Sequence, residues 1–90
     1  MFILTIKGKE SEGAYSVLNS DGEHILYIFQ EEDDAVRYAL MLEDSDHPEM
    51  HVFEVDEDVI IQACKSHAYD YVIITPDDIV IPPNSNYDFI

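Results

Sequence analysis

Three side chains of types that bind divalent metals, His47, Glu49 and His51, occupy alternate positions around Pro48. Imidazole and carboxylate groups are common zinc ligands, so the trio could converge on one ion. Two histidines four positions apart do so only if a helix or hairpin aligns them, and Pro48 disfavours a helix. The spacing matches no specific zinc signature. We therefore expect exposed loop residues and no cofactor, and keep a small metal-binding domain as an alternative.

Cys64 and His67 form a second candidate for chemistry, because a spacing of three on a helix allows the side chains to touch. A thiol beside an imidazole could act as a nucleophile and its base, given a group to orient the imidazole and an oxyanion donor. The sequence indicates neither group. Cys64 shares its helical register with Ile60 and Ile61, which predicts a buried structural thiol. We expect no enzyme, with an enzyme-like domain using this pair as the alternative.

Two acidic clusters, at residues 31–34 and 56–58, could pair carboxylates for acid–base chemistry or bind Ca²⁺ or Mg²⁺. Neither has the Asp-x-Asp-x-Asp-Gly spacing of a calcium-binding loop. Each opens an expected helix, where acidic side chains interact favourably with the helix dipole. If the two helices pack side by side, their starts form one negative rim that could bind lysines and arginines of a partner. The rim residues would be Glu31, Glu32, Asp33, Asp34, Asp56, Glu57 and Asp58.

The charge of the whole chain limits its partners more than any motif does. Twenty acidic residues against four Lys and Arg give a formal charge of −16. Such a field repels phosphate backbones and anionic lipids, so we expect no nucleic-acid binding and no membrane docking, and a basic protein as partner. Solubility alone, or adaptation to high salt, would also account for the charge. A nucleic-acid mimic is a further alternative, which would need carboxylates spaced along one long face.

The 90 residues predict one folded domain over 1–83 and an irregular tail over 84–90. Hydrophobic residues make up 47% of the chain, too many for a disordered protein. The single cysteine excludes an internal disulfide, and the sequence shows neither a signal peptide nor a membrane span. These features predict a cytoplasmic protein. Among the six tyrosines we expect Tyr15, Tyr69 and Tyr71 to be partly exposed.

The hydrophobic pattern predicts the order β-β-β-α-β-α-β. Strands are expected over 2–7, 15–18, 24–29, 52–55 and 71–74, an edge segment over 79–81, and helices from 31 to about 43–46 and over 57–67. We expect an α+β two-layer sandwich, a mainly antiparallel sheet with both helices on one face. A ferredoxin-like arrangement is an analogy compatible with this class. An uncovered sheet edge would allow a homodimer.

Several segments together resemble a known family. They are Glu12-Gly13-Ala14-Tyr15-Ser16, the passage from Phe29 to Glu43, Cys64, and Pro82-Pro83-Asn84. The most specific part is Glu32-Asp33-Asp34-Ala35-Val36-Arg37-Tyr38-Ala39. The chain is similar to a small uncharacterised family, a domain of unknown function, of cyanobacteria and plant plastids. The resemblance implies a cytosolic or stromal setting and supplies no activity or catalytic residue.

Overall fold

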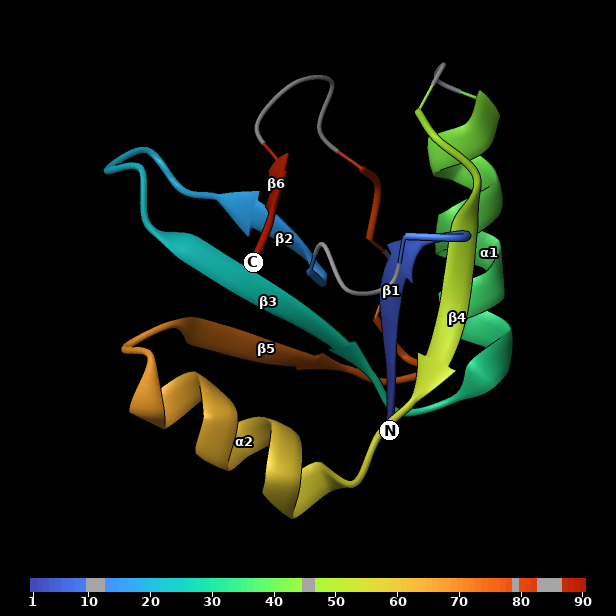
Figure 1. Cartoon of the computed structure of the whole chain (residues 1–90). Helices are drawn as coiled ribbons and strands as arrows, with labels where there is room; N and C mark the ends of the chain where they lie inside the picture. The colour runs from blue at the N-terminus through green and yellow to red at the C-terminus, as the bar shows by residue number, and fades with distance from the viewer. Residues whose placement is uncertain (10–12, 45–46, 79, 83–86) are drawn as a thin grey trace.

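The computed structural model describes residues 1–9, 13–44, 47–78, 80–82 and 87–90, which contain six strands and two helices (Figure 1). The five expected strands and both helices are present, the expected edge segment over 79–81 is not among the strands that the structure describes, and one strand is added at the end. In chain order they are β1 (Phe2–Ile6), β2 (Tyr15–Leu18), β3 (His24–Phe29), α1 (Glu32–Asp44), β4 (Met50–Glu54), α2 (Glu57–Ser66), β5 (Asp70–Ile74) and β6 (Tyr87–Phe89).

The strands form one sheet in which β3 is central. Strand β3 pairs antiparallel with β2 and with the start of β1, and parallel with β5. Strand β4 pairs antiparallel with β1, and β6 pairs antiparallel with β2, so the path runs β4-β1-β3-β2-β6 with β5 on β3. The predicted α+β class with a mainly antiparallel sheet is therefore confirmed. The chain order differs from the β-α-β-β-α-β order of a ferredoxin-like fold.

The two helices pack on opposite faces of this sheet, which corrects the expected two-layer arrangement with both helices on one face. In β1, Leu4 belongs to the cluster packed with α1, whereas its neighbour Ile3 belongs to the cluster packed with Cys64 of α2. Strand β3 repeats the pattern, with Phe29 on the α1 side and Ile28 on the α2 side. Because successive side chains of a strand point to opposite faces, an apolar residue at every position of β3 after His24 requires cover on both.

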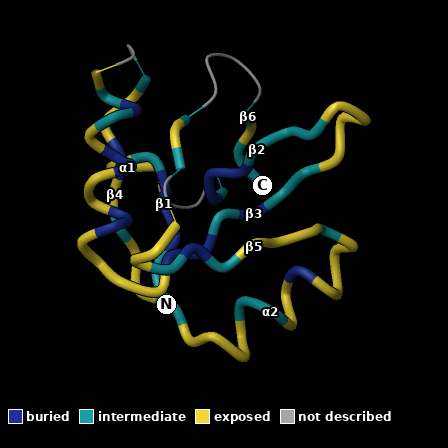
Figure 2. The backbone as a smooth tube through the Cα atoms, turned by 180° about the vertical axis from the view of Figure 1, so that it is seen from behind, coloured by how far each residue is buried: buried dark blue, intermediate teal, exposed yellow. Residues whose placement is uncertain are grey.

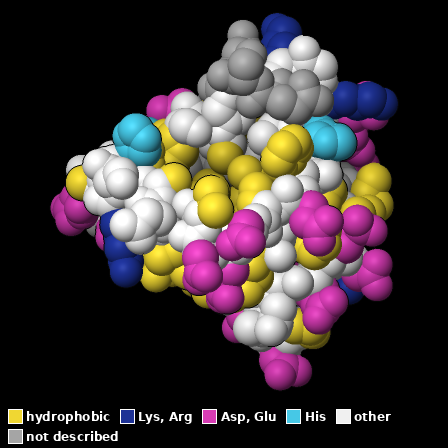
Figure 3. Space-filling view, turned by 60° about the horizontal axis from the view of Figure 1, so that its bottom comes forward, with side chains coloured by type: hydrophobic (Ala, Val, Ile, Leu, Met, Phe, Trp, Pro, Cys, Tyr) yellow, Lys and Arg dark blue, Asp and Glu magenta, His cyan; other side chains and the backbone are white. Residues whose placement is uncertain are grey.

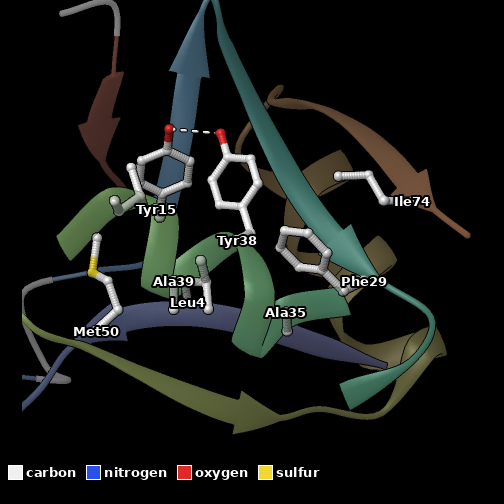
Figure 4. Packing of buried hydrophobic residues seen from close by; sticks show 9 residues of the cluster. Leu4, Tyr15, Phe29, Ala35, Tyr38, Ala39, Met50 and Ile74 are labelled. Carbon is white, nitrogen blue, oxygen red and sulfur yellow. Dashed lines mark hydrogen bonds between the residues drawn. The ribbon is translucent and has the colours of Figure 1, made fainter. Parts of the chain in front are cut away.

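The larger core lies between the sheet and α1 (Figure 4). Tyr15 and Tyr38 are buried there, and their hydroxyl oxygens form a hydrogen bond 2.9 Å long. The expected partial exposure of Tyr15 is wrong, because the register of β2 directs its ring into this cluster. Figure 2 shows that buried residues concentrate where β1, β3 and α1 meet, while most of α2 is exposed.

The end of the chain belongs to the sheet, which corrects the prediction of an irregular tail over 84–90. Residues 87–89 form β6, and Ile90 exchanges two backbone hydrogen bonds with Ala14. Residues 84–86 lie outside the described residues. Of the expected edge segment over 79–81, Val80 and Ile81 are not in a strand and Ile79 lies outside the described residues. The folded domain therefore includes β6.

Candidate functional site

The three candidate metal ligands have separate surroundings. His47 is partly buried, and its Nδ1 lies 3.1 Å from the carbonyl oxygen of Leu42. Glu49 forms an exposed ion pair with Lys7 at 3.0 Å, and His51 is exposed on β4. Within the described ranges, no group of three or more His, Cys, Asp or Glu side chains is placed to hold a metal ion.

Cys64 and His67 differ in their exposure to solvent. Cys64 is only 2% exposed, and this burial raises the pKa of its thiol. His67 is exposed at the C-terminal end of α2, where its ring stacks on Tyr69. A hollow of about 260 Å³ borders both residues, but its lining is mainly apolar. A buried thiol with a raised pKa supplies little thiolate near neutral pH, so this arrangement does not favour nucleophilic chemistry.

The starts of the two helices lie at the same end of the molecule (Figure 1). Phe2 at the start of β1 pairs with Phe29, just before α1, and with Glu54, just before α2. The end of β5 reaches the same place, because the backbone N–H of Gln30 donates to the carbonyl of Ile74. The turn after β5 therefore lies at the same end of the molecule as the two helix starts.

We call the exposed carboxylates of this region the acidic end. Besides the helix starts, it takes in the last residue of β4 and the turn after β5, neither of which was expected from the sequence. Figure 3 shows Asp and Glu side chains gathered on this face, with Lys and Arg side chains toward its margins. The acidic end comprises Glu31, Glu32, Asp33, Glu54, Asp56, Glu57, Asp58, Asp77 and Asp78, all of them exposed.

Asp34 does not belong to this exposed surface, which corrects its assignment to the rim. It is 8% exposed, on the side of α1 that faces the core together with Ala35 and Tyr38. Its Oδ1 accepts a hydrogen bond of 3.0 Å from Nη1 of Arg37, whereas its Oδ2 is buried and, in the described part of the chain, has no hydrogen-bond partner. The helical period explains the difference, since adjacent positions of a helix face different directions.

Comparison with known families shows the family to which the chain belongs. A family model described as a domain of unknown function (DUF3110) matches residues 1–84. The chain belongs to this family. No curated protein and no solved structure matched it. In the described part of the chain, no helix is long and apolar enough to cross a membrane.

Local interactions account for only part of the acidic end of this DUF3110 domain. The Asp56 carboxylate caps α2 by accepting from the backbone N–H groups of Asp58 and Val59, at 3.0 and 3.4 Å. The side chains of Glu57 and Asp58 in the first turn also interact favourably with the helix dipole. Glu54 and Asp77 lie outside both helices, so neither capping nor the helix dipole accounts for them. Glu54 reaches this end because it lies two residues before the capping residue of α2, and the pairing of β5 with β3, which the sequence did not reveal, brings Asp77 there.

Proposed function

We propose that this DUF3110 domain is a non-enzymatic protein-binding or regulatory module that presents its acidic end to a basic partner protein. The observation that supports this proposal is the strand register, which gathers exposed carboxylates from three separate stretches, residues 31–33, 54–58 and 77–78, at one end. We place the module in the cytosol of a cyanobacterial-type cell, as its family resemblance implies.

The positions of the basic residues strengthen this proposal. The molecule has four Lys and Arg residues, and the only one near the acidic end is Arg37, which is paired with Asp34. Lys7 and Lys9 follow the far end of β1, and Lys65 lies in the last turn of α2. Apart from Arg37, which is paired with Asp34, the carboxylates of the acidic end therefore lack neighbouring lysine or arginine side chains that would neutralise them.

Such a surface acts mainly on the rate and salt dependence of association. Complementary charge steers a partner toward the correct face and raises the association rate at low ionic strength. Each exposed ion pair contributes only about 0–1 kcal/mol, so binding needs several pairs and some apolar contact. Phe53 and Val59, both exposed, adjoin the acidic end in the chain and provide apolar area.

Affinity capture from a native cell extract at low and high salt tests the proposal. The test variant carries Asp33→Lys, Glu57→Lys and Asp58→Lys, and it spares buried Asp34 and the capping residue Asp56. The matched control carries three exposed reversals away from the acidic end, at the β2–β3 turn, the last residue of α1 and the first residue of β5: Asp21→Lys, Asp44→Lys and Asp70→Lys.

We expect the wild type and the control variant to retain a basic protein at low salt and release it at high salt, while the test variant captures none. Equal capture by both triple variants would show that net charge, and not the acidic end, determines binding. A nucleic-acid mimic has less support, because it needs carboxylates spaced along one long face, whereas these gather where the two helix starts and the turn after β5 meet.

The homodimer remains a prediction. Within the described strands, β4, β5 and β6 each pair with one neighbour only, which leaves an edge of each uncovered. The formal charge of −16 on each copy opposes self-association. Sedimentation equilibrium at low and high salt measures whether a dimer forms once the charge is screened.

A further inference from the structure

A second hollow, of about 190 Å³, lies between α1 and the segment that follows β5. Its polar lining includes Asp34 and Arg37 from α1 and Asp78 from the turn, and Asp78 also belongs to the acidic end. Apolar side chains, among them Met41, Val80 and Ile81, line the rest of it. The hollow therefore combines two carboxylates, one guanidinium and an apolar wall.

The Asp34 carboxylate in this hollow is incompletely satisfied. Its side chain is more than nine-tenths buried, and Arg37 occupies only Oδ1. Its Oδ2 has no hydrogen-bond partner among the residues that the structure describes. Leaving a buried charged oxygen unpaired is costly, and native structures rarely do so without a reason. This oxygen has less than 1 Å² of accessible surface, so a cationic hydrogen-bond donor in the hollow could pair with it only after a neighbouring side chain moved.

The hydrogen bonds that the two carboxylates already make favour an ammonium over a guanidinium as that donor. Oδ2 of Asp78 accepts from the backbone N–H and the hydroxyl of Thr75, at 2.8 and 3.0 Å, and within the described residues its Oδ1 accepts no hydrogen bond. Each carboxylate thus offers a single oxygen. A guanidinium binds best to both oxygens of one carboxylate, whereas an ammonium can donate separately to two groups.

We propose that this hollow binds the ammonium group of a lysine side chain of the basic partner, with the lysine methylenes against Met41, Val80 and Ile81. The inference rests on the proposed function, since it names one residue type that the partner presents. The Arg37 side chain is 65% exposed, so it can move aside and release the Asp34 carboxylate to the incoming ammonium. Arg37 then acts as an internal competitor for the same carboxylate.

Titration of the isotope-labelled domain with n-butylammonium chloride, followed by NMR at constant ionic strength, tests this proposal. n-Butylammonium reproduces the end of a lysine side chain. n-Butyltrimethylammonium has the same charge and stem but no N–H donor, and serves as the control probe. We expect saturable shifts of the amide signals of Arg37, Asp78 and Val80 with the first probe. Linear shifts spread over all acidic residues, or equal affinity for both probes, would overturn the proposal.

Three variants sharpen the test. Asp34→Asn is expected to weaken n-butylammonium binding about tenfold or more, because a charged hydrogen bond is lost. Asp33→Asn, an equal change of charge at the exposed neighbouring position, should leave the affinity within about twofold, as a screened surface charge does. Arg37→Gln should strengthen binding, because it removes the competing cation. If Asp34→Asn does not fold, the affinity of Arg37→Gln for n-butylammonium and the comparison with n-butyltrimethylammonium still test the proposal.

Failure of this inference is distinguishable from failure of the proposed function. Capture of a basic protein by the acidic end without saturable n-butylammonium binding would refute the lysine site alone. Loss of capture specificity together with a functioning amine site would refute the proposed function alone.

Discussion

The hydrogen bond between Tyr15 and Tyr38 gives a prediction whose size follows from the structure. The two hydroxyl oxygens lie 2.9 Å apart, and the side chains are 1% and 0% exposed. Tyr38→Phe removes one hydroxyl and leaves the other without this partner in a largely apolar cluster. The penalty for a buried unpaired polar group is about 1–3 kcal/mol of the free energy of unfolding. For a domain of this size, each kcal/mol lowers Tm by about 4–8 °C.

A double-mutant cycle separates this hydrogen bond from the remaining effects of the substitutions. Tyr15→Phe with Tyr38→Phe removes both hydroxyls, so no polar group is left unpaired by the change. We expect the double variant to lose less stability than the sum of the two single variants, with a coupling energy of about 1 kcal/mol in urea unfolding. Tyr71→Phe, at an exposed position, is the control and should change stability by less than about 0.5 kcal/mol. Additive single effects would refute the reasoning.

Three further predictions concern stability. Gly13→Ala should lower the free energy of unfolding in urea by about 1–3 kcal/mol, because Gly13 has φ +122° and an added Cβ would lie 2.7 Å from the carbonyl oxygen of Ile90. Asp56→Ala should cost about 0.5–2 kcal/mol in the same assay, because it removes the cap of α2, whereas Asp56→Asn should restore most of this. Burial raises the pKa of Tyr15 to about 12 from 10.0. The contribution of this residue to stability should therefore be constant below about pH 10 and fall as the pH rises toward 12. A Tm that does not change with pH over that interval would contradict this prediction.

Local sequence signals were sufficient to predict most of the elements. The Asp21-Gly22 pair lies in the turn between β2 and β3, and Gly22 has φ +79°, the positive value that an Asp-Gly pair favours in such a turn. Acidic residues do open both helices. Each of these features depends on neighbours in the chain, which a pattern along the sequence can report.

The features that could not be predicted depend on contacts between distant parts of the chain. Strand β6 has three residues, too few for a recognisable pattern, and it forms because Tyr87–Phe89 can pair with β2. The side on which α2 packs follows from the parallel pairing of β5 with β3, which no local signal specifies. Asp34 and Asp33 have the same local signal, and only packing distinguishes the buried residue from the exposed one.

The candidate site also combines residues predicted from local sequence with residues brought there by the fold. The sequence identified the helix-start carboxylates, and the topology added Glu54 and the two aspartates of the turn after β5. Capping and dipole interactions account for acids at helix starts in any protein, so the helix starts alone are weak evidence for a binding surface. Carboxylates brought there from β4 and the β5 turn increase repulsion with little compensation from the helix dipoles. A dispersed charge would serve solubility equally well, so this gathering of carboxylates is the feature that the proposed binding of a cationic partner would use.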